Sequence, residues 1–360
     1  MATRVDAATT SRPQSERAET RLERIELADP LWRAFVAARA DALAIHRPEW
    51  AALLADCYGF EPFVLAVRGE RGEIEAGLPV LAVGARRRRW VSLPFTDYCP
   101  VLGDGGVGGA SLLRAADAAR RAAGATSLEL RSVAGLEASA PPVGFRHILE
   151  LSADPDVVYA RFHPSQVKRA LQRVERDGAL TLRAAERRED LTRVFYALHL
   201  ATRRRLGSPV QPRRFFELLW DRIVEPGLGN VLLAYAGSRP VAAGVFLTSG
   251  DSLLYKYAAS DRTAWSLRPN HLIIWKAIRD ACAAGVRTLD FGRTELGHQG
   301  LRNFKASWGA REQPLVYVRL EDDGIAGAPL PSRTASAAVI RHAPDVVCRL
   351  IGELLYRYAA

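Results

Sequence analysis

The chain carries one succession of apolar and polar runs twice. Short alternating or β-branched runs predict strands, and longer runs with apolar residues three or four positions apart predict helices. In each half the predicted order is three strands, a helix and a fourth strand. The clearest elements are strands at 63–67, 74–83 and 127–130 with a helix at about 111–123, and strands from 231 and at 288–291 with a helix at 272–284.

Local similarities between the two halves support a duplication. Aligning Leu112 with Ile273 places Gly124 on Gly285, and upstream the residues around Gly77 match those around Gly244. An interval of roughly 165 residues is the size of a whole domain and too long for a solenoid repeat. We therefore predict two tandem domains of one α/β (α+β) type.

The second half concentrates polar residues around a predicted crossover. Strand 255–257, helix 272–284, strand 288–291 and the loop up to Trp308 form a βαβ unit, and ligands in open α/β sheets sit at such strand ends. Only four of the 50 basic residues are lysines: Lys168, Lys256, Lys276 and Lys305. In so arginine-rich a chain, a lysine is favoured where a compact ammonium is needed.

Composition narrows the class of protein. The net charge of +10 suggests an anionic partner such as nucleic acid, a phosphate group or an anionic membrane, although arginine-rich composition alone could produce it. There is no signal sequence and no apolar run long enough for a membrane helix. The four cysteines lack a C-x-x-C spacing and the seven histidines lack metal-site spacing, so we predict reduced thiols, a cytoplasmic location and no metal.

Composition shifts divide the chain into four predicted parts. Residues 1–24 are expected to form a disordered leader, 25–145 a first domain, 146–320 a second domain, and 321–360 a linker with a last helix near 344–358. We expect this helix to dock on the body of the protein. Packing in a dimer and contact with a membrane are the alternatives.

Motifs across the second half resemble the FemAB family, aminoacyl and acyl transferases built from two GNAT-like (N-acetyltransferase-fold) domains. The matching segments are the basic helix Lys168–Gly178, Arg204–Gly207, Ala258–Asp261, Pro269–Leu272, Trp275–Ile278, Asp290–Arg293, Phe304-Lys305 and Trp308-Gly309. The resemblance covers residues 145–320 well and 25–145 loosely. It implies two tandem GNAT-like (acyl-CoA N-acyltransferase) domains with mixed central sheets flanked by helices, the second one catalytic.

Two departures leave the acyl donor open. Ser266–Asn270 stands where ordinary GNAT enzymes have the [QR]-x-x-G-x-[GA] loop that holds the coenzyme A pyrophosphate. The chain also lacks the long coiled-coil insertion that some family members turn towards tRNA. The donor is therefore predicted to be an acyl-CoA or an aminoacyl-tRNA, with a slight preference for the CoA thioester or another small donor.

The predicted donor-binding residues surround the start of the helix at 269. Free N–H groups there and a positive dipole end suit a phosphate, and Arg268 can add a bidentate contact. With Arg268 we group Asn270, His271 and Phe304 as donor-binding residues.

Lys305 is the first catalytic candidate, because an ammonium can neutralise a developing oxyanion. The resemblance also implies that the Phe-Lys pair lies beside the transfer centre. Asp290 and His298 are candidate proton acceptors. The predicted substrate-binding residues are Tyr255, Tyr257, Lys168 and Arg293. Strand alternation is expected to point Lys256 away from the two tyrosines beside it.

These features predict an N-acyltransferase that passes an acyl or aminoacyl group to an amine of a cell-envelope or polysaccharide precursor. One alternative is a peptidoglycan-type aminoacyltransferase that uses aminoacyl-tRNA. Another is a non-catalytic double-GNAT module that binds nucleic acid through the helix at 165–177. That helix lacks the aromatic residues that stack on bases, and no DNA partner is predicted. The predicted partners are the amine-bearing precursor, tRNA as an option, and a peripheral contact with the inner membrane.

Overall fold

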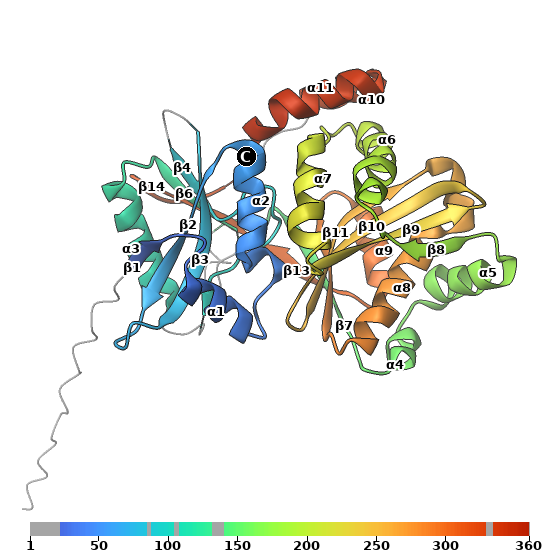
Figure 1. Cartoon of the computed structure of the whole chain (residues 1–360), viewed down its shortest axis with the longest axis horizontal. Coiled ribbons are helices and arrows are strands. Elements are labelled where there is room, and N and C mark those ends of the chain that lie inside the picture. Colours follow the sequence, from blue (N-terminus) through green and yellow to red (C-terminus); the bar gives the residue numbers. More distant parts are fainter. Residues whose placement is uncertain (1–21, 85–87, 104–107, 132–139, 329–333, 360) are drawn as a thin grey trace, which may run out of the picture.

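The structure is a computed structural model that describes residues 22–84, 88–103, 108–131, 140–328 and 334–359. Two mixed β-sheets lie side by side, each flanked by helices (Figure 1). The predicted α/β class with mixed sheets is confirmed.

The N-terminal sheet has the strand order β1-β2-β3-β4-β6-β14-β15, with β5 beside β3. Its strands are β1 (Leu22–Ile25), β2 (Glu61–Arg68), β3 (Ile74–Val83), β4 (Arg89–Val91), β5 (Leu102–Gly103), β6 (Ser127–Arg131), β14 (Tyr317–Glu321) and β15 (Gly324–Gly327).

The C-terminal sheet has the order β13-β7-β12-β11-β10-β9-β8. Its strands are β7 (Gly144–Glu150), β8 (Thr181–Ala184), β9 (Gly229–Ala236), β10 (Arg239–Ser249), β11 (Ser252–Ser260), β12 (Thr288–Thr294) and β13 (Arg311–Leu315).

Helices cover both sheets. They are α1 (Pro30–Ala38), α2 (Pro48–Tyr58), α3 (Gly108–Ala122), α4 (Pro155–Ala160), α5 (Arg169–Asp177), α6 (Tyr196–Leu206), α7 (Arg213–Leu219), α8 (Pro269–Ala283), α9 (Gln299–Ser307), α10 (Thr334–His342) and α11 (Asp345–Leu355). Single helical turns of other types lie at Ala44–His46, Pro164–Lys168, Asp190–Phe195, Trp220–Val224, Arg262–Leu267 and Tyr356–Ala359. In the second half α8 packs on one face of the sheet, while α6 packs on the opposite face, which α7 also covers.

The connectivity confirms the duplication. In the first half the antiparallel strands β2, β3 and β4 lead through α3 to β6, which pairs in parallel with β4. In the second half β9, β10 and β11 lead through α8 to β12, which pairs in parallel with β11. The aligned glycines pack against different helices, since Trp32 belongs to α1 and Ile273 to α8. A Cβ at Gly77 would lie 2.5 Å from the Trp32 ring, and one at Gly244 would lie 2.9 Å from Ile273.

The predicted domain limits need three corrections. Leu22–Arg24, placed in the leader, belong to β1, while residues 1–21 lie outside the described part. Gly144 and Phe145, assigned to the first domain, start β7 of the second sheet. The chain also returns to the first sheet at Tyr317, where β14 pairs with β6, so the limit at 320 falls inside that strand. Strand pairing across hundreds of residues leaves no local signal in a sequence.

One hydrophobic core joins the two halves. It contains Trp50 and Tyr58 of α2 together with Phe215 of α7, and all three rings are buried. Phe215 meets Trp50 edge-on at 6.2 Å and stacks on Tyr58 at 6.4 Å between ring centroids. Because these aromatic side chains are buried against one another across the junction, we expect the two halves to unfold together.

Replacing Phe215 with alanine should therefore lower the free energy of unfolding by about 3–5 kcal/mol, since it leaves a cavity at the junction. Urea unfolding followed by tryptophan fluorescence and far-UV circular dichroism measures this. We expect a single transition in both signals. Leu31→Ala, at an exposed site, should stay within about 0.5 kcal/mol of wild type. Two separate transitions in the wild type would contradict the shared core.

Candidate functional site

The strands β11 and β12 part in the middle of the C-terminal sheet. Their parallel pairing covers only Ser252–Leu254 and Thr288–Asp290. Beyond that point both strands are irregular. The register of β11 against β10 shifts at Tyr255–Tyr257, and that of β12 against β7 shifts between Asp290 and Arg293. Gly292 lies in the second shift with φ +69°, a conformation that favours glycine.

The bulge in β11 overturns the expected orientation of Lys256. An extra residue breaks the alternation of side chains. Tyr255 stacks on Phe246 at 4.6 Å, on the α8 side of the sheet. Tyr257 packs against Phe215 on the other side, and Lys256 Nζ lies 5.6 Å from the Tyr257 ring. The two tyrosines therefore point apart, and Lys256 shares a side with Tyr257.

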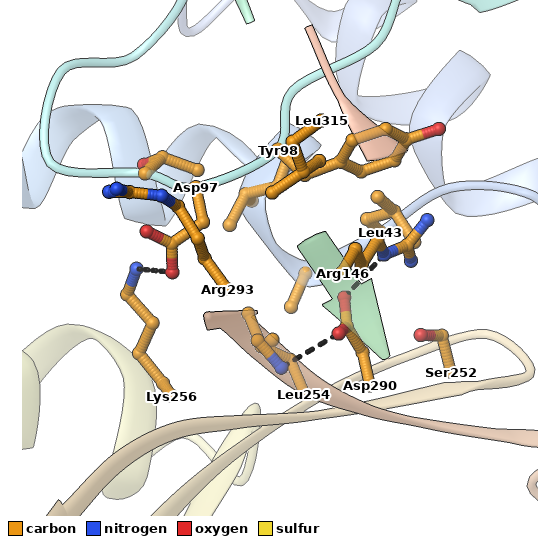
Figure 2. A pocket seen from close by; sticks show the side chains of 14 residues that line it. Leu43, Asp97, Tyr98, Arg146, Ser252, Leu254, Lys256, Asp290, Arg293 and Leu315 are labelled. Atoms are coloured by element: carbon orange, nitrogen blue, oxygen red, sulfur yellow. Dashed lines mark hydrogen bonds and ion pairs between the residues drawn. The ribbon is translucent and has the colours of Figure 1, made fainter. Parts of the chain in front are cut away.

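A cavity of about 420 Å³, a volume that includes the solvent space at its mouth, lies between the two halves at this point, and we call it the interdomain cavity (Figure 2). It is lined by Leu43, Ala44, Ile45, Thr96, Asp97, Tyr98, Arg146, Ser252, Leu254, Lys256, Asp290, Gly292, Arg293 and Leu315. The first half thus supplies two segments of its wall, and strands β7, β11 and β12 supply most of the rest.

The loop that carries Asp97 is held in a strained conformation. Leu93 and Phe95 have φ angles of +56° and +61°, which cost non-glycine residues free energy. His46 ties this loop to the other wall segment. Its Nδ1 accepts the Leu43 N–H at 3.0 Å and its Nε2 bonds to Pro100 O at 2.9 Å. Burial lowers the pKa of His46 to about 4, so the ring is neutral and suits one donor and one acceptor role.

Asp97 presents an open carboxylate to the cavity. Its side chain keeps 42% of its exposure although protein surrounds it, and no hydrogen bond from the described residues reaches its carboxylate oxygens. Burial by itself raises the pKa of Asp97, but the positive charges of Lys256, Arg293 and Arg131 outweigh it and lower the pKa. The carboxylate is therefore ionised and available to a cation.

Lys256 faces Asp97 from β11 (Figure 2). Its Nζ donates to Phe95 O at 3.1 Å and lies 3.9 Å from Asp97 Oδ2, too far for a hydrogen bond. Burial lowers the pKa of Lys256, and the Asp97 charge offsets part of that effect.

Asp290, one predicted proton acceptor, lies in the wall on the other side of the cavity (Figure 2). Oδ2 accepts from Arg146 Nε at 2.7 Å, and Oδ1 accepts the Gly292 N–H at 2.8 Å. Both oxygens are thus engaged, and the carboxylate fixes the irregular segment of β12. Arg293, a predicted substrate contact, also lines the cavity, and its buried Nε has no partner.

Lys305, the first catalytic candidate, lies against the back of β12. Its Nζ donates to Gly292 O at 2.8 Å and to Arg293 O at 3.2 Å, and it lines neither the interdomain cavity nor the groove described next. Burial lowers its pKa to about 8, against the opposing charges of Asp290 and Asp97. In this geometry Lys305 positions the split strand, so a direct chemical role stays a prediction.

A second hollow, the α5–α8 groove, lies on the other face of the sheet. It is lined by Ser165, Gln166, Arg169, Ala170, Arg173, Arg268, His271 and Phe304. Three of the four predicted donor-binding residues meet here, and the His271 and Phe304 rings lie 5.5 Å apart. Burial, aided by Arg268, lowers the pKa of His271 to about 4, which leaves the groove's positive charge on its three arginines.

The two hollows open on opposite faces at the strand split. Leu254 lines the interdomain cavity, whereas its neighbours Leu253 and Tyr255 pack in the core under α8. His271 and Phe304 contact that same core from the groove. Leu254, Gly292 and Arg293, at the parting of β11 and β12, thus belong to the wall of the interdomain cavity, and the groove lies on the α8 side of the core.

Several predicted residues lie outside both hollows. His298 caps α9, where its Nδ1 accepts the Leu301 N–H, and it is exposed. Lys168 donates to Ala160 O, away from the groove. Tyr255 and Tyr257 are packed in the two cores, and the buried Oδ1 of Asn270 has no partner within the chain.

Sequence reasoning missed Asp97, Arg146, Arg169 and Arg173 as site residues. Asp97 lies in the other half of the chain. Arg146 lies in β7, which precedes the helices of the second half in the sequence and pairs with β12. The only available signal for Arg169 and Arg173 was their spacing of four on a basic helix next to Lys168.

The described residues hold no group of three or more side chains suited to a metal ion. Within the same residues, no helix is long and apolar enough to cross a membrane.

Comparisons with known proteins place the fold. Residues 161–306 match the family model described as the acetyltransferase (GNAT) domain. No curated protein matches the chain.

Solved structures extend this likeness to the whole chain. FemX is 18% identical, with 81% of this chain and 95% of that chain covered and a TM-score of 0.63. A C-terminal domain from Agrobacterium fabrum, described as that of a lysylphosphatidylglycerol synthetase, is 15% identical over 86% and 94% of the two chains, with a TM-score of 0.52. A tandem GNAT protein from the clavulanic acid biosynthesis pathway is 15% identical over 87% and 100%, with a TM-score of 0.51. The predicted tandem GNAT fold of FemAB type and the acyltransferase class are confirmed.

The burial of Lys305 predicts how the free energy of unfolding depends on pH. Its folded pKa of about 8 lies below the ordinary value of 10.5, so the unfolded chain binds this proton more tightly. Stability should therefore rise with pH between these values. From pH 7 to pH 10, the unfolding free energy of wild type should increase relative to Lys305→Met by on the order of 2 kcal/mol. Urea unfolding of both proteins at the two pH values measures this. An equal pH dependence in both would refute the burial of a charged Lys305.

Proposed function

We propose that this protein transfers an acyl group from an acyl-CoA thioester to an amine that binds in the interdomain cavity. The observation that carries this proposal is the pair of hollows on opposite faces of the sheet, one of them lined by residues at the point where β11 and β12 part. A donor and an acceptor can meet there in line, which removes much of the entropic cost of a bimolecular step.

The α5–α8 groove suits the phosphate-bearing part of the donor. Arg169 and Arg173 extend from α5, and Arg268 stands at the start of α8, at the positive end of the helix dipole. Among the described residues no carboxylate lines this groove, and Asp177 pairs with Arg173 from outside its lining. Its charge and shape therefore support a polyphosphate ligand, while the acyl chain would enter the strand gap.

The interdomain cavity suits a cationic acceptor. The open carboxylate of Asp97 can hold an ammonium group. A Cβ built on Gly292 would lie 3.8 Å from Asp97 Oδ2 and 3.6 Å from Tyr255 O, so Asp97 lies close to the gap. Because its pKa is low, Asp97 orients the acceptor and is a weak proton acceptor.

The reaction balances without a further reactant. The ammonium first loses one proton to water. The neutral nitrogen then forms a bond to the acyl carbon, the C–S bond breaks, and the second proton that nitrogen loses ends on the thiol of free CoA. The structural likeness to FemX and to the C-terminal domain of a lysylphosphatidylglycerol synthetase supports a cell-envelope or polysaccharide precursor as the carrier of the acceptor amine.

An aminoacyl-tRNA donor is the second candidate. The exposed face of α5 continues the basic lining of the groove through Arg176, so a longer polyanion could lie along it. Release of free CoA from acetyl-CoA, against release of deacylated tRNA from aminoacyl-tRNA, separates the two donors.

Removing the groove arginines should weaken donor binding. Arg173→Ala and Arg268→Ala should each raise the KM for acetyl-CoA roughly tenfold, since each removes an exposed charge-assisted contact. Release of CoA thiol with a panel of amino sugars and lysine peptides gives the rates. Arg279→Ala is the matched control, because Arg279 is an exposed arginine near the other end of α8. An equal effect of all three variants would argue against the groove.

Neutralising Asp97 should weaken acceptor use. Asp97→Asn keeps the shape but removes the charge, so kcat/KM for the amine should fall roughly ten- to a hundredfold while the KM for acetyl-CoA is unchanged. Asp323→Asn, at an exposed turn, is the control. Unchanged kcat/KM in Asp97→Asn would remove the acceptor from this cavity.

A further inference from the structure

The C-terminal helix α11 turns its apolar side away from the protein. Val346, Leu350, Leu354 and Tyr358 keep 59%, 53%, 65% and 75% of their exposure. Val347 and Leu355 are exposed beside them. At 3.6 residues per turn these side chains cover about half of the helix circumference. A helix docked through its apolar face would bury this stripe instead.

A narrow stripe of other residues holds α11 on the body. Cys348, Gly352 and Tyr356 are spaced four apart and are buried. A Cβ at Gly352 would lie 2.3 Å from Val210 O, so the helix sits directly on the backbone. Tyr356 stacks on Tyr58 at 5.9 Å. The helix is therefore fixed in place, crossing the ends of α2, α6 and α7 (Figure 1).

The acidic side chains of α11 are used in this attachment. Asp345 pairs with Arg204, and Glu353 accepts the Arg213 N–H at 2.8 Å. Arg214 and Arg357 stand beside Glu353 in the wall of a small surface hollow, and Arg341 of α10 is exposed. The surroundings of the apolar stripe thus carry excess positive charge, in line with the net charge of +10.

We propose that the exposed stripe of α11 docks on an anionic lipid bilayer, lying in the plane of its interface. The apolar side chains would enter the boundary of headgroups and acyl chains, and the flanking arginines would meet the lipid phosphates. Eleven residues span roughly 16 Å, which suits a helix lying on a membrane and is too short to cross one.

Charge favours a lipid surface over a second copy of the chain. Pairing two copies through this stripe would bring together two positively charged surfaces, whereas anionic lipid is attracted to them. The inference does not depend on the transfer reaction, because it rests on α11 alone.

The full chain, mixed with vesicles of equal parts phosphatidylcholine and phosphatidylglycerol, should sediment with them. Vesicles of phosphatidylcholine alone and added salt should both reduce binding. Leu350→Ser/Leu354→Ser should lower the partition coefficient roughly tenfold or more, since two exposed leucines that would enter the bilayer are lost from the lipid contact. Circular dichroism checks that this variant keeps the fold.

Leu31→Ser/Ile325→Ser is the matched control, because it removes two exposed apolar side chains elsewhere and should bind as wild type does. Absence of wild-type binding to the anionic vesicles would overturn the proposal, as would equal binding by the two double variants. Light scattering measures whether the wild type forms a dimer. A wild-type dimer that Leu350→Ser/Leu354→Ser converts to a monomer, without lipid binding, would assign the stripe to self-association instead.

Discussion

The short parallel contact between β11 and β12 is the constraint on which the rest of the site depends. Three residue pairs hold these strands together, and beyond them each strand departs from regular pairing. The interdomain cavity lies at this gap, and Leu254, Gly292 and Arg293 line it. At the gap, Lys305 Nζ donates hydrogen bonds to the main-chain oxygens of Gly292 and Arg293, which a neighbouring strand would otherwise provide. The parted strands are therefore stabilised by a lysine that is itself buried, and that burial is unfavourable for its charged form.

The first half of the chain completes what the second half begins. Its loop brings Asp97 over the gap, its α2 buries Trp50 against the helices of the second half, and the neutral His46 locks the loop. The return of β14 to the first sheet ties the two halves together a second time. A GNAT domain alone would leave the interdomain cavity open to water, so the doubled architecture encloses this cavity.

The two hollows differ in the charged residues that line them, and so each favours a different kind of ligand. The α5–α8 groove has arginines and, within the described part of the chain, no carboxylate in its lining, while the interdomain cavity balances Asp97 and Asp290 against Lys256, Arg146 and Arg293. Phosphate oxygens are favoured in the first. In the second, the one carboxylate without a hydrogen bond, Asp97, favours a cation. In the proposed reaction, this difference would keep donor and acceptor from exchanging places.

The order of apolar runs determined the fold, because strands and helices of a duplicated unit leave their periods in the sequence even where few residues match. It also determined that His271, Phe304 and Arg268 would gather, since they lie on consecutive elements of one crossover. Only the tertiary structure decided the rest. A bulge reversed the side on which Lys256 lies, and burial turned Lys305 into a support for β12. Asp97 joined the site from a distant loop, and α11 docked through Cys348 and Gly352 with its apolar side outwards. These outcomes depend on strand register, on contacts between distant residues and on which face of a helix packs against the protein. Local periodicity in the sequence encodes none of them.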